Sequence, residues 1–346
     1  MYASKFLSSM GCEKPIIQAP MAGAQDSRLA IAVCNAGGMG SLPCAMLNTE
    51  QIEREIKNIQ SNTSSPFNVN FFAHNLVEYT PTMERKWYKV LKPYYEAFGL
   101  TENDISSTGG RQPFNQETAD LIADLKVPLV SFHFGLPNDV LLKQVKDSGA
   151  KVISTATTIA EAAWLQSKGV DAIIAQGLEA GGHRGMFLSH DISTQSGTFS
   201  LLPNLVKSVD LPVIAAGGIS DRITAQCAFA LGADAIQVGT AFLLADEATT
   251  KTAHRQALQR ESVNETRLTN IFSGGIARGI KNQFIADLGI HKDAPPFPYA
   301  SFITDPLKQN AERLGNHEFS AMWAGQNACF AKPGQAEEIL RRIVGS

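Results

Sequence analysis

The chain has 346 residues, of which 44% are hydrophobic and 18% charged, and this composition is typical of a folded globular protein rather than a disordered one. Its 30 basic and 33 acidic side chains give a formal net charge of -3 without long runs of Lys or Arg, which argues against a nucleic-acid or anionic-membrane surface. This length corresponds to about two domains or to one enlarged α/β barrel.

We expect neither an export signal nor a membrane span. The opening MYASKFLSSMGCEKP has no apolar signal-peptide core, and no later stretch approaches about 18 consecutive apolar residues. Five cysteines are scattered without a C-x-x-C pair, and His183 and His190 have no third ligand at a suitable spacing. We therefore expect reduced thiols, a cytoplasmic protein and no metal site.

Short apolar runs bounded by Gly or Pro alternate with longer amphipathic stretches, which is typical of a parallel sheet with helices between its strands. Capping and stop signals predict such helices, for example from 49, over 158–167 and over 221–231. Eight strands are predicted, at residues 15–18, 39–42, 67–72, 128–134, 151–155, 172–176, 212–216 and 235–239. We predict a TIM-like (β/α)8 barrel, a single domain over 1–346, with an open doubly wound sheet as the alternative.

Two segments interrupt this alternation. Residues 74–114 contain an aromatic and charged stretch, and we interpret them as an insertion over the barrel mouth with a helix around 81–98. Residues 245–346 form a late extension with a helix at about 247–260, a Pro-rich stretch and a helical tail. Such additions shape a pocket or a dimer contact, so we expect a monomer or a homodimer.

Glycines follow the last two predicted strands, where the active site of a barrel lies. Gly217-Gly218 and Gly239-Thr240 place small residues where the loops after these strands meet the starts of helices. Without bulky side chains, the backbone N–H groups there are exposed and can bind a phosphate. The alternative is that these glycines only make tight turns. Because two such sites lie on adjacent strands, we favour a phosphorylated ligand.

Polar side chains at other strand ends suggest what that ligand is. The amides of Asn70 and Gln176 suit the edge of a flavin ring, and Met21 could pack on its face, although all three could also be ordinary interior residues. His183, in a glycine-rich loop, could act as a base or anion partner, or could only contact solvent. His133 faces the barrel interior with Ser131, and a satisfied core histidine is the alternative.

Four strings together resemble the class I nitronate monooxygenases, formerly called 2-nitropropane dioxygenases, which are FMN-dependent barrels. These strings are PIIQAPMAG at 15–23, FNVNFF at 67–72, SFHFG at 131–135 and AQGLEAGGHRG at 175–185. The resemblance continues through PVIAAGGI and DAIQVGTAFL to WAGQNA at 323–328. It covers most of the chain, and the motifs are specific when taken together.

The resemblance implies an FMN site, a catalytic His183 and no need for a reduced pyridine nucleotide. It implies that propionate 3-nitronate reacts with O2 to give malonate semialdehyde with nitrite and nitrate. We assign substrate contacts to His133, His183 and Tyr299, the last with Lys308 toward a substrate carboxylate. The residues expected to bind FMN are Met21, Ala22, Gly23, Asn70, Gln176, Gly181, Gly217, Gly218, Gln237, Val238, Gly239 and Thr240.

One stretch departs from the family pattern, because residues 273–279 read SGGIARG where relatives commonly read SGRPARG. The function of that arginine is then absent here or supplied elsewhere. Two other FMN enzymes share the barrel motifs: an enoyl-acyl-carrier-protein reductase and an NADH:quinone reductase. FNVNFF and SFHFG favour the monooxygenase. A non-catalytic flavin- or phosphate-binding protein is the alternative of a different class.

Overall fold

Eight parallel strands form the centre of the computed structural model, which describes residues 3–106 and 111–345. They follow the order β1-β9-β8-β6-β5-β4-β3-β2, and a parallel bridge between Ile17 and Met39 joins β1 to β2 and closes the barrel. The predicted TIM-like barrel is confirmed. Its strands are β1 Ile16–Gln18, β2 Gly40–Pro43, β3 Phe67–Phe72, β4 Leu129–His133, β5 Lys151–Ala156, β6 Ala172–Gln176, β8 Val213–Ala216 and β9 Ala235–Val238.

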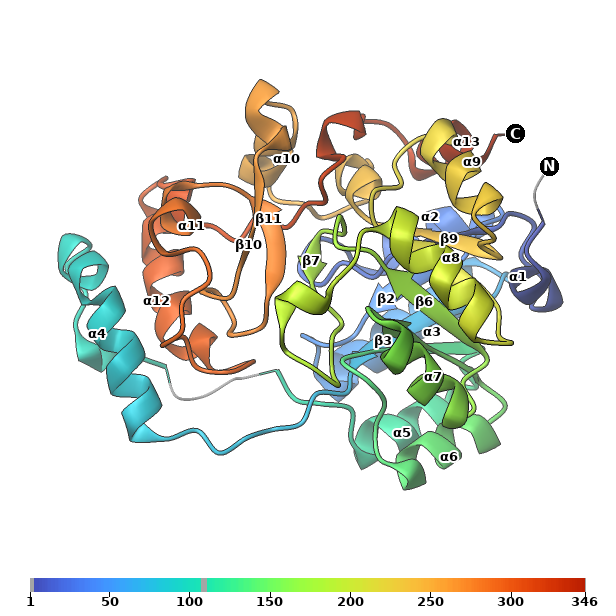
Figure 1. The fold of residues 1–346 in the computed structure, drawn as a ribbon, viewed down its shortest axis with the longest axis horizontal. Coiled ribbons are helices and arrows are strands. Elements are labelled where there is room, and N and C mark those ends of the chain that lie inside the picture. The colour runs from blue at the N-terminus through green and yellow to red at the C-terminus, as the bar shows by residue number, and fades with distance from the viewer. Residues whose placement is uncertain (1–2, 107–110, 346) are drawn as a thin grey trace.

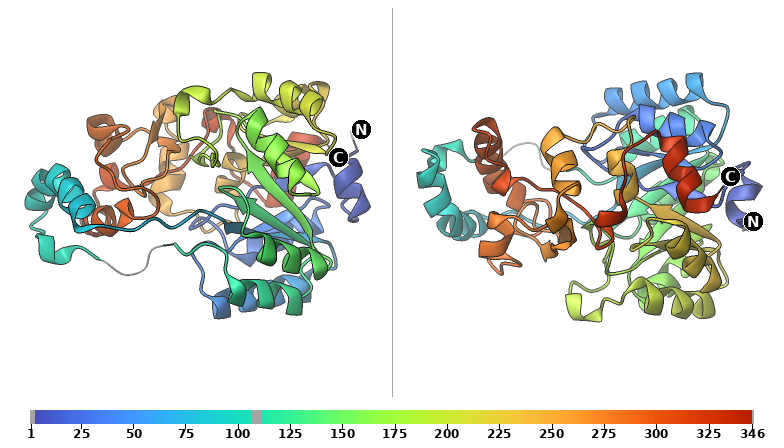
Figure 2. Two further views of the ribbon diagram at one scale, coloured as in Figure 1. Left: turned by 60° about the horizontal axis from the view of Figure 1, so that its bottom comes forward. Right: turned by 90° about the horizontal axis from the view of Figure 1, so that it is seen from above.

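Helices surround this barrel (Figures 1 and 2). Most lie between consecutive strands, and α13 (Ala336–Val344) returns from the end of the chain to pack on α2 and α9. The others are α2 Ser27–Asn35, α3 Thr49–Asn62, α5 Gln116–Asp124, α6 Asp139–Asp147, α7 Ile159–Ser167, α8 Thr198–Ser208 and α9 Arg222–Ala230. No helix in the described part of the chain is long and apolar enough to cross a membrane.

The strands are apolar on both faces because each face is buried in a different layer. Ile16 packs in the outer core against the helices, whereas its neighbour Ile17 belongs to the cluster inside the barrel. Phe6 and Leu7 of α1 (Lys5–Ser9) join that inner cluster. Helix α1 therefore contributes to the core at the amino-terminal end of the strands, and the carboxyl-terminal end is left for a site.

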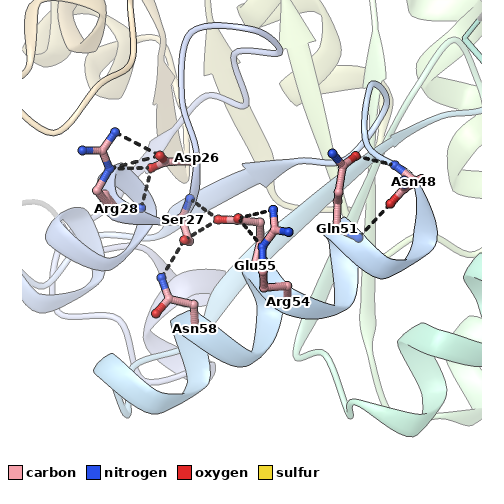
Figure 3. A network of polar contacts seen from close by, with 8 residues as sticks. All are labelled: Asp26, Ser27, Arg28, Asn48, Gln51, Arg54, Glu55 and Asn58. Atoms are coloured by element: carbon pink, nitrogen blue, oxygen red, sulfur yellow. Dashed lines mark hydrogen bonds and ion pairs between the residues drawn. The ribbon is translucent and has the colours of Figure 1, made fainter.

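A polar network ties the first two outer helices together (Figure 3). The Glu55 carboxylate accepts hydrogen bonds from the Ser27 amide at 3.1 Å and the Ser27 hydroxyl at 2.5 Å. Asn58 donates to the same hydroxyl at 2.8 Å. One carboxylate of α3 thus accepts a hydrogen bond from an N–H group in the first turn of α2 that has no partner within its own helix. Negative charge is favourable at this position.

A small antiparallel sheet outside the barrel was not among the predicted elements. It has the order β10-β11-β7, where β10 is Thr266–Thr269, β11 is Ala277–Ile280 and β7 is Gly182–His183. Strands this short carry too few residues for a period-2 pattern to be recognised. This sheet pairs His183 with Ala277, so it holds the predicted catalytic residue against the extension.

The insertion and the extension pack on each other. Trp87 and Tyr95 of α4 (Pro81–Ala97) are buried with Ile303 and Leu307 of α12 (Ala300–Arg313), and the Trp87 indole donates to the Thr304 hydroxyl at 3.1 Å. Figures 1 and 2 show α4 beside α12 at the end of the molecule opposite both termini. The two segments therefore share a core of their own.

The remaining elements of the extension are short. Helix α10 (Thr252–Leu258) begins later than predicted. The backbone amides before it bond to other segments, since the Asp246 amide donates to the Gly334 carbonyl and the Thr249 amide donates to the Ala24 carbonyl. Helix α11 is Gln283–Leu288. Turns of 3-10 helix lie at Glu102–Asp104, Ile192–Thr194, Thr240–Leu244, Glu261–Asn264, His317–Phe319 and Ala328–Phe330.

Candidate active site

A cavity of about 600 Å³ lies at the carboxyl-terminal ends of the barrel strands, a volume within the usual range for a small molecule or cofactor. Segments from the barrel loops, the insertion and the extension all line it. It brings together thirteen of the predicted site residues: Met21, Ala22, Gly23, Asn70, His133, Gln176, Gly181, His183, Gly217, Gly218, Gln237, Gly239 and Thr240.

Two predicted site residues lie elsewhere. The Val238 side chain is buried in the outer core, on the other face of β9. The Tyr299 ring stacks on Tyr79 with 5.0 Å between centroids, and its hydroxyl donates to the Val77 carbonyl at 2.7 Å. Tyr299 thus joins the extension to the insertion, whereas Lys308 does line the cavity.

The His183 backbone is held from two sides. Its carbonyl accepts hydrogen bonds from Gln176 Nε2 at 3.0 Å and from His133 Nε2 at 3.1 Å, while β11 pairs with its other edge. Gln176 Oε1 accepts from the Gly185 amide at 2.8 Å. Below the loop, the buried Arg184 guanidinium donates to the Gln176 and Gly177 carbonyls. The loop is therefore preorganised before any ligand binds.

Gln176 and His133 line the cavity, and both also hydrogen-bond to the His183 backbone. Because the His183 carbonyl can only accept, His133 Nε2 carries the proton, and its Nδ1 accepts from the Thr155 hydroxyl at 3.1 Å. Burial lowers the pKa of His133 to about 4, so this tautomer is neutral. Asn70 likewise donates to the Ser131 hydroxyl at 3.0 Å. These contacts match the interior roles that the sequence left open.

Aromatic rings surround the His183 imidazole. Phe297, Trp323, Phe134 and Phe72 lie with centroids 5.3, 5.5, 6.0 and 6.3 Å from it, and Nε2 lies 2.7 Å from Ser273 Oγ. Burial, followed by the nearby positive charge of Arg111, holds the pKa of His183 well below its usual value. At neutral pH this imidazole is uncharged and can accept a proton or a hydrogen bond.

Phe134 reaches this cluster through an unusual backbone. Its φ is 67°, in the left-handed region that non-glycine residues rarely adopt, and Gly135 follows with φ 90°. The turn at the end of β4 directs the Phe134 ring toward Phe297, with centroids 5.0 Å apart. Backbone strain of this kind concentrates at functional sites.

The predicted phosphate cradle consists of converging backbone loops. Gly217 and Gly218 have φ of 104° and 73°, and a Cβ on Gly217 would lie 3.0 Å from the Ala180 amide nitrogen. Residues 324–327 close the same region, because Asn327 donates to the Gly218 carbonyl and the Gly325 amide donates to Thr240 Oγ1. Glycine is therefore needed at 217 for both conformation and space.

The cavity wall carries buried polar atoms that have no hydrogen-bond partner within the described residues. They are Ser220 Oγ, Gln237 Oε1, Thr250 Oγ1 and His254 Nε2. Such atoms are costly unless a ligand or water satisfies them. Glycine backbone and a hydroxyl suit a phosphate, while Met21, Asn70 and the aromatic rings suit a flat heterocycle. The residues present thus fit FMN.

Four further residues line the cavity or lie beside His183, and the sequence did not assign them to the site. Ser220 follows the Gly217-Gly218 pair, and this position could have suggested it. Arg111, Ser273 and Phe297 come from the insertion and the extension, and their approach to His183 depends on tertiary packing that no local pattern shows. In the described ranges, no group of three or more His, Cys, Asp or Glu side chains could hold a metal ion.

Fold and cavity together define a TIM-like barrel enzyme with its site at the carboxyl ends of the strands. The family model for nitronate monooxygenase matches residues 4–345. The nitronate monooxygenase of Paraburkholderia phytofirmans is 39% identical to this chain, over 97% of the chain and 93% of that protein. The chain belongs to the nitronate monooxygenase family and is an oxidoreductase.

Solved structures show the same architecture. A nitroalkane oxidase from Streptomyces ansochromogenes is similar with a TM-score of 0.88 and 35% identity, over 97% of this chain and 96% of that one. FabK from Thermotoga maritima is similar with a TM-score of 0.75 and 26% identity, over 99% of this chain and 95% of that one. The sequence identity to this chain is therefore higher for the nitronate monooxygenase and the nitroalkane oxidase than for FabK.

Proposed function

We propose that this protein binds FMN in the barrel cavity and uses O2 to oxidise alkyl nitronates, with propionate 3-nitronate as its preferred substrate. The products are malonate semialdehyde, nitrite and nitrate. The observation that carries the proposal is the uncharged His183 imidazole, fixed by its backbone and facing an aromatic cavity beside a glycine cradle. Membership of the nitronate monooxygenase family supports the same reaction class.

Different residues of the cavity would bind the phosphate and the ring of FMN. The glycine loops and the Ser220 hydroxyl would hold the FMN phosphate, and Met21 and Asn70 would meet its ring. FMN supplies the redox chemistry between nitronate and O2 when bound. The protein orients the nitronate with Phe134 and Phe297, which also exclude water from it.

His183 then acts at the substrate. Because its pKa lies well below the usual value, the imidazole is unprotonated over the neutral range. It can take the α-proton of a neutral nitroalkane and so form the nitronate at the site. With a preformed nitronate, it orients the substrate without supplying charge.

The substrate is tested by following O2 uptake of the FMN-loaded protein with propionate 3-nitronate and, in parallel, with ethyl nitronate. We expect kcat/KM to be at least about 10-fold higher for the carboxylated substrate, because a charged hydrogen bond contributes about 1.5–3 kcal/mol. Equal values would contradict the substrate assignment. Oxidation of NADH without nitronate turnover would favour a reductase instead.

A further inference from the structure

The cavity contains a positive charge that neither the fold nor the family assignment explains. Three cationic side chains line it: Arg111, Lys251 and Lys308. Lys251 is paired with Glu312 at 2.9 Å, and Lys308 is paired with Asp305. Within the described ranges, no carboxylate lies within the 4.0 Å of an ion pair from the Arg111 guanidinium. Arg111 is thus the one of the three without an acidic partner there.

Arg111 lies near the predicted catalytic residue. Its guanidinium carbon is 5.7 Å from the Phe297 ring centroid, and that ring lies 5.3 Å from the His183 ring. Asp305 acts on Arg111 from farther away and is already paired with Lys308. A mostly buried guanidinium that has an aromatic face beside it and no ion-pair partner among the described residues is costly to maintain, and an anionic ligand would compensate that cost.

The histidines around this position do not supply positive charge. Burial lowers the pKa of His74 and His133 to about 4, and it holds the pKa of His183 well below its usual value. A nitronate and a carboxylate are both planar anions with two oxygens, and a guanidinium can bind either of them through two parallel hydrogen bonds.

We propose that Arg111 is the substrate's anion-binding residue, and that it binds the planar pair of anionic oxygens while His183 acts on the same molecule. This assignment rests on the proposed function for the identity of the substrate, but not for the presence of an anion site. It gives the insertion a direct part in substrate recognition. Arg111 then determines the preference for anionic over neutral ligands.

The test separates binding from turnover. Propionate and propionamide are nearly isosteric but differ in charge, and their dissociation constants can be measured from changes in the visible spectrum of the bound flavin. We expect the wild-type protein to bind propionate at least about 10-fold more tightly than propionamide. Arg111→Gln should abolish this preference and Arg111→Lys should retain part of it. Arg28→Gln, at a surface ion pair with Asp26, is the matched control and should retain all of it.

Turnover then identifies which anionic group Arg111 meets. In Arg111→Gln, KM should rise about 10- to 100-fold while kcat changes less than about threefold. An equal rise for propionate 3-nitronate and ethyl nitronate assigns the contact to the nitronate group. A rise for propionate 3-nitronate alone assigns it to the carboxylate.

Two outcomes keep this proposal distinct from the proposed function. If the folded Arg111→Gln variant, checked by circular dichroism, has unchanged propionate affinity and unchanged KM values, the anion-binding role of Arg111 is wrong. If the wild-type protein turns over no nitronate but its propionate preference depends on Arg111, the anion site remains and the proposed reaction fails.

Discussion

His183 and the glycines that follow the late strands could be predicted from their neighbours in the sequence. Gly181-Gly182-His183 and Gly217-Gly218 combine residue types that need special backbone or small volume, and the structure brings both into one cavity. Arg111 could not be predicted in this way, because its position depends on how the insertion returns to the barrel. Tyr299 lies outside the cavity lining for a similar reason, since it packs on Tyr79.

A prediction at this scale concerns Ser220, whose buried hydroxyl has no partner within the described residues. If the cradle binds the FMN phosphate, Ser220→Ala should weaken FMN binding about 10- to 100-fold, since a hydrogen bond to a charged group contributes about 1.5–3 kcal/mol. The affinity is measured by quenching of FMN fluorescence on titration with the FMN-free protein. Ser167→Ala, whose exposed hydroxyl bonds only within its helix turn, should bind like the wild type; equal loss in both variants would argue against the cradle.

At the scale of elements, the barrel strands could be predicted to within one or two residues, because apolar runs between Gly and Pro are specific for buried parallel strands. For example, β3 and β6 have the expected bounds, 67–72 and 172–176. The sheet of β7, β10 and β11 could not be predicted, since its strands are short and pair across distant segments. The same sheet positions His183.

The link between α2 and α3 gives a prediction at this scale. Glu55→Ala removes the acceptor of both Ser27 hydrogen bonds, so it should lower the free energy of unfolding by about 1–3 kcal/mol. Glu53→Ala on the same helix is the control, because Glu53 forms an exposed pair with Lys57 and should change the value by less than about 1 kcal/mol. Urea unfolding measures both, and indistinguishable variants would show that the network adds no stability.

For the whole molecule, the sequence indicated an insertion and an extension, but not that they share a core. Trp87 and Ile303 lie in segments that are far apart in the chain, and the sequence around either residue does not indicate its partner. Their packing brings Arg111, Phe297 and Lys308 to the barrel. The shape of the cavity is therefore a property of the complete chain.

Buried neutral histidines give the whole molecule a pH-dependent stability. Burial lowers the pKa of His74, His133 and His254 to about 4, whereas each has a pKa near 6.5 when unfolded. Between these two pKa values the unfolded chain binds more protons than the folded protein. The contribution of the neutral histidines to the free energy of unfolding is therefore fully present above about pH 7. It falls as the pH drops, by up to about 1.4 kcal/mol per pH unit for each histidine.

Urea unfolding of the FMN-free protein at pH 7.5, 6 and 5 measures this loss. In His254→Gln, the fall in the free energy of unfolding between pH 6 and 5 should be smaller than in the wild type by about 1 kcal/mol, because one proton fewer is taken up on unfolding. Parallel curves for the two proteins over this range would show that His254 is not a buried neutral group.

The central claim is that an uncharged His183 acts on a nitronate in this cavity. The most direct test is O2 uptake by FMN-loaded wild-type and His183→Asn proteins, with propionate 3-nitronate and NADH added in separate runs. The account predicts rapid uptake with the nitronate alone and a decrease in kcat/KM of about 10²- to 10⁴-fold in the variant. Unchanged activity in His183→Asn, or uptake with NADH alone, would contradict it.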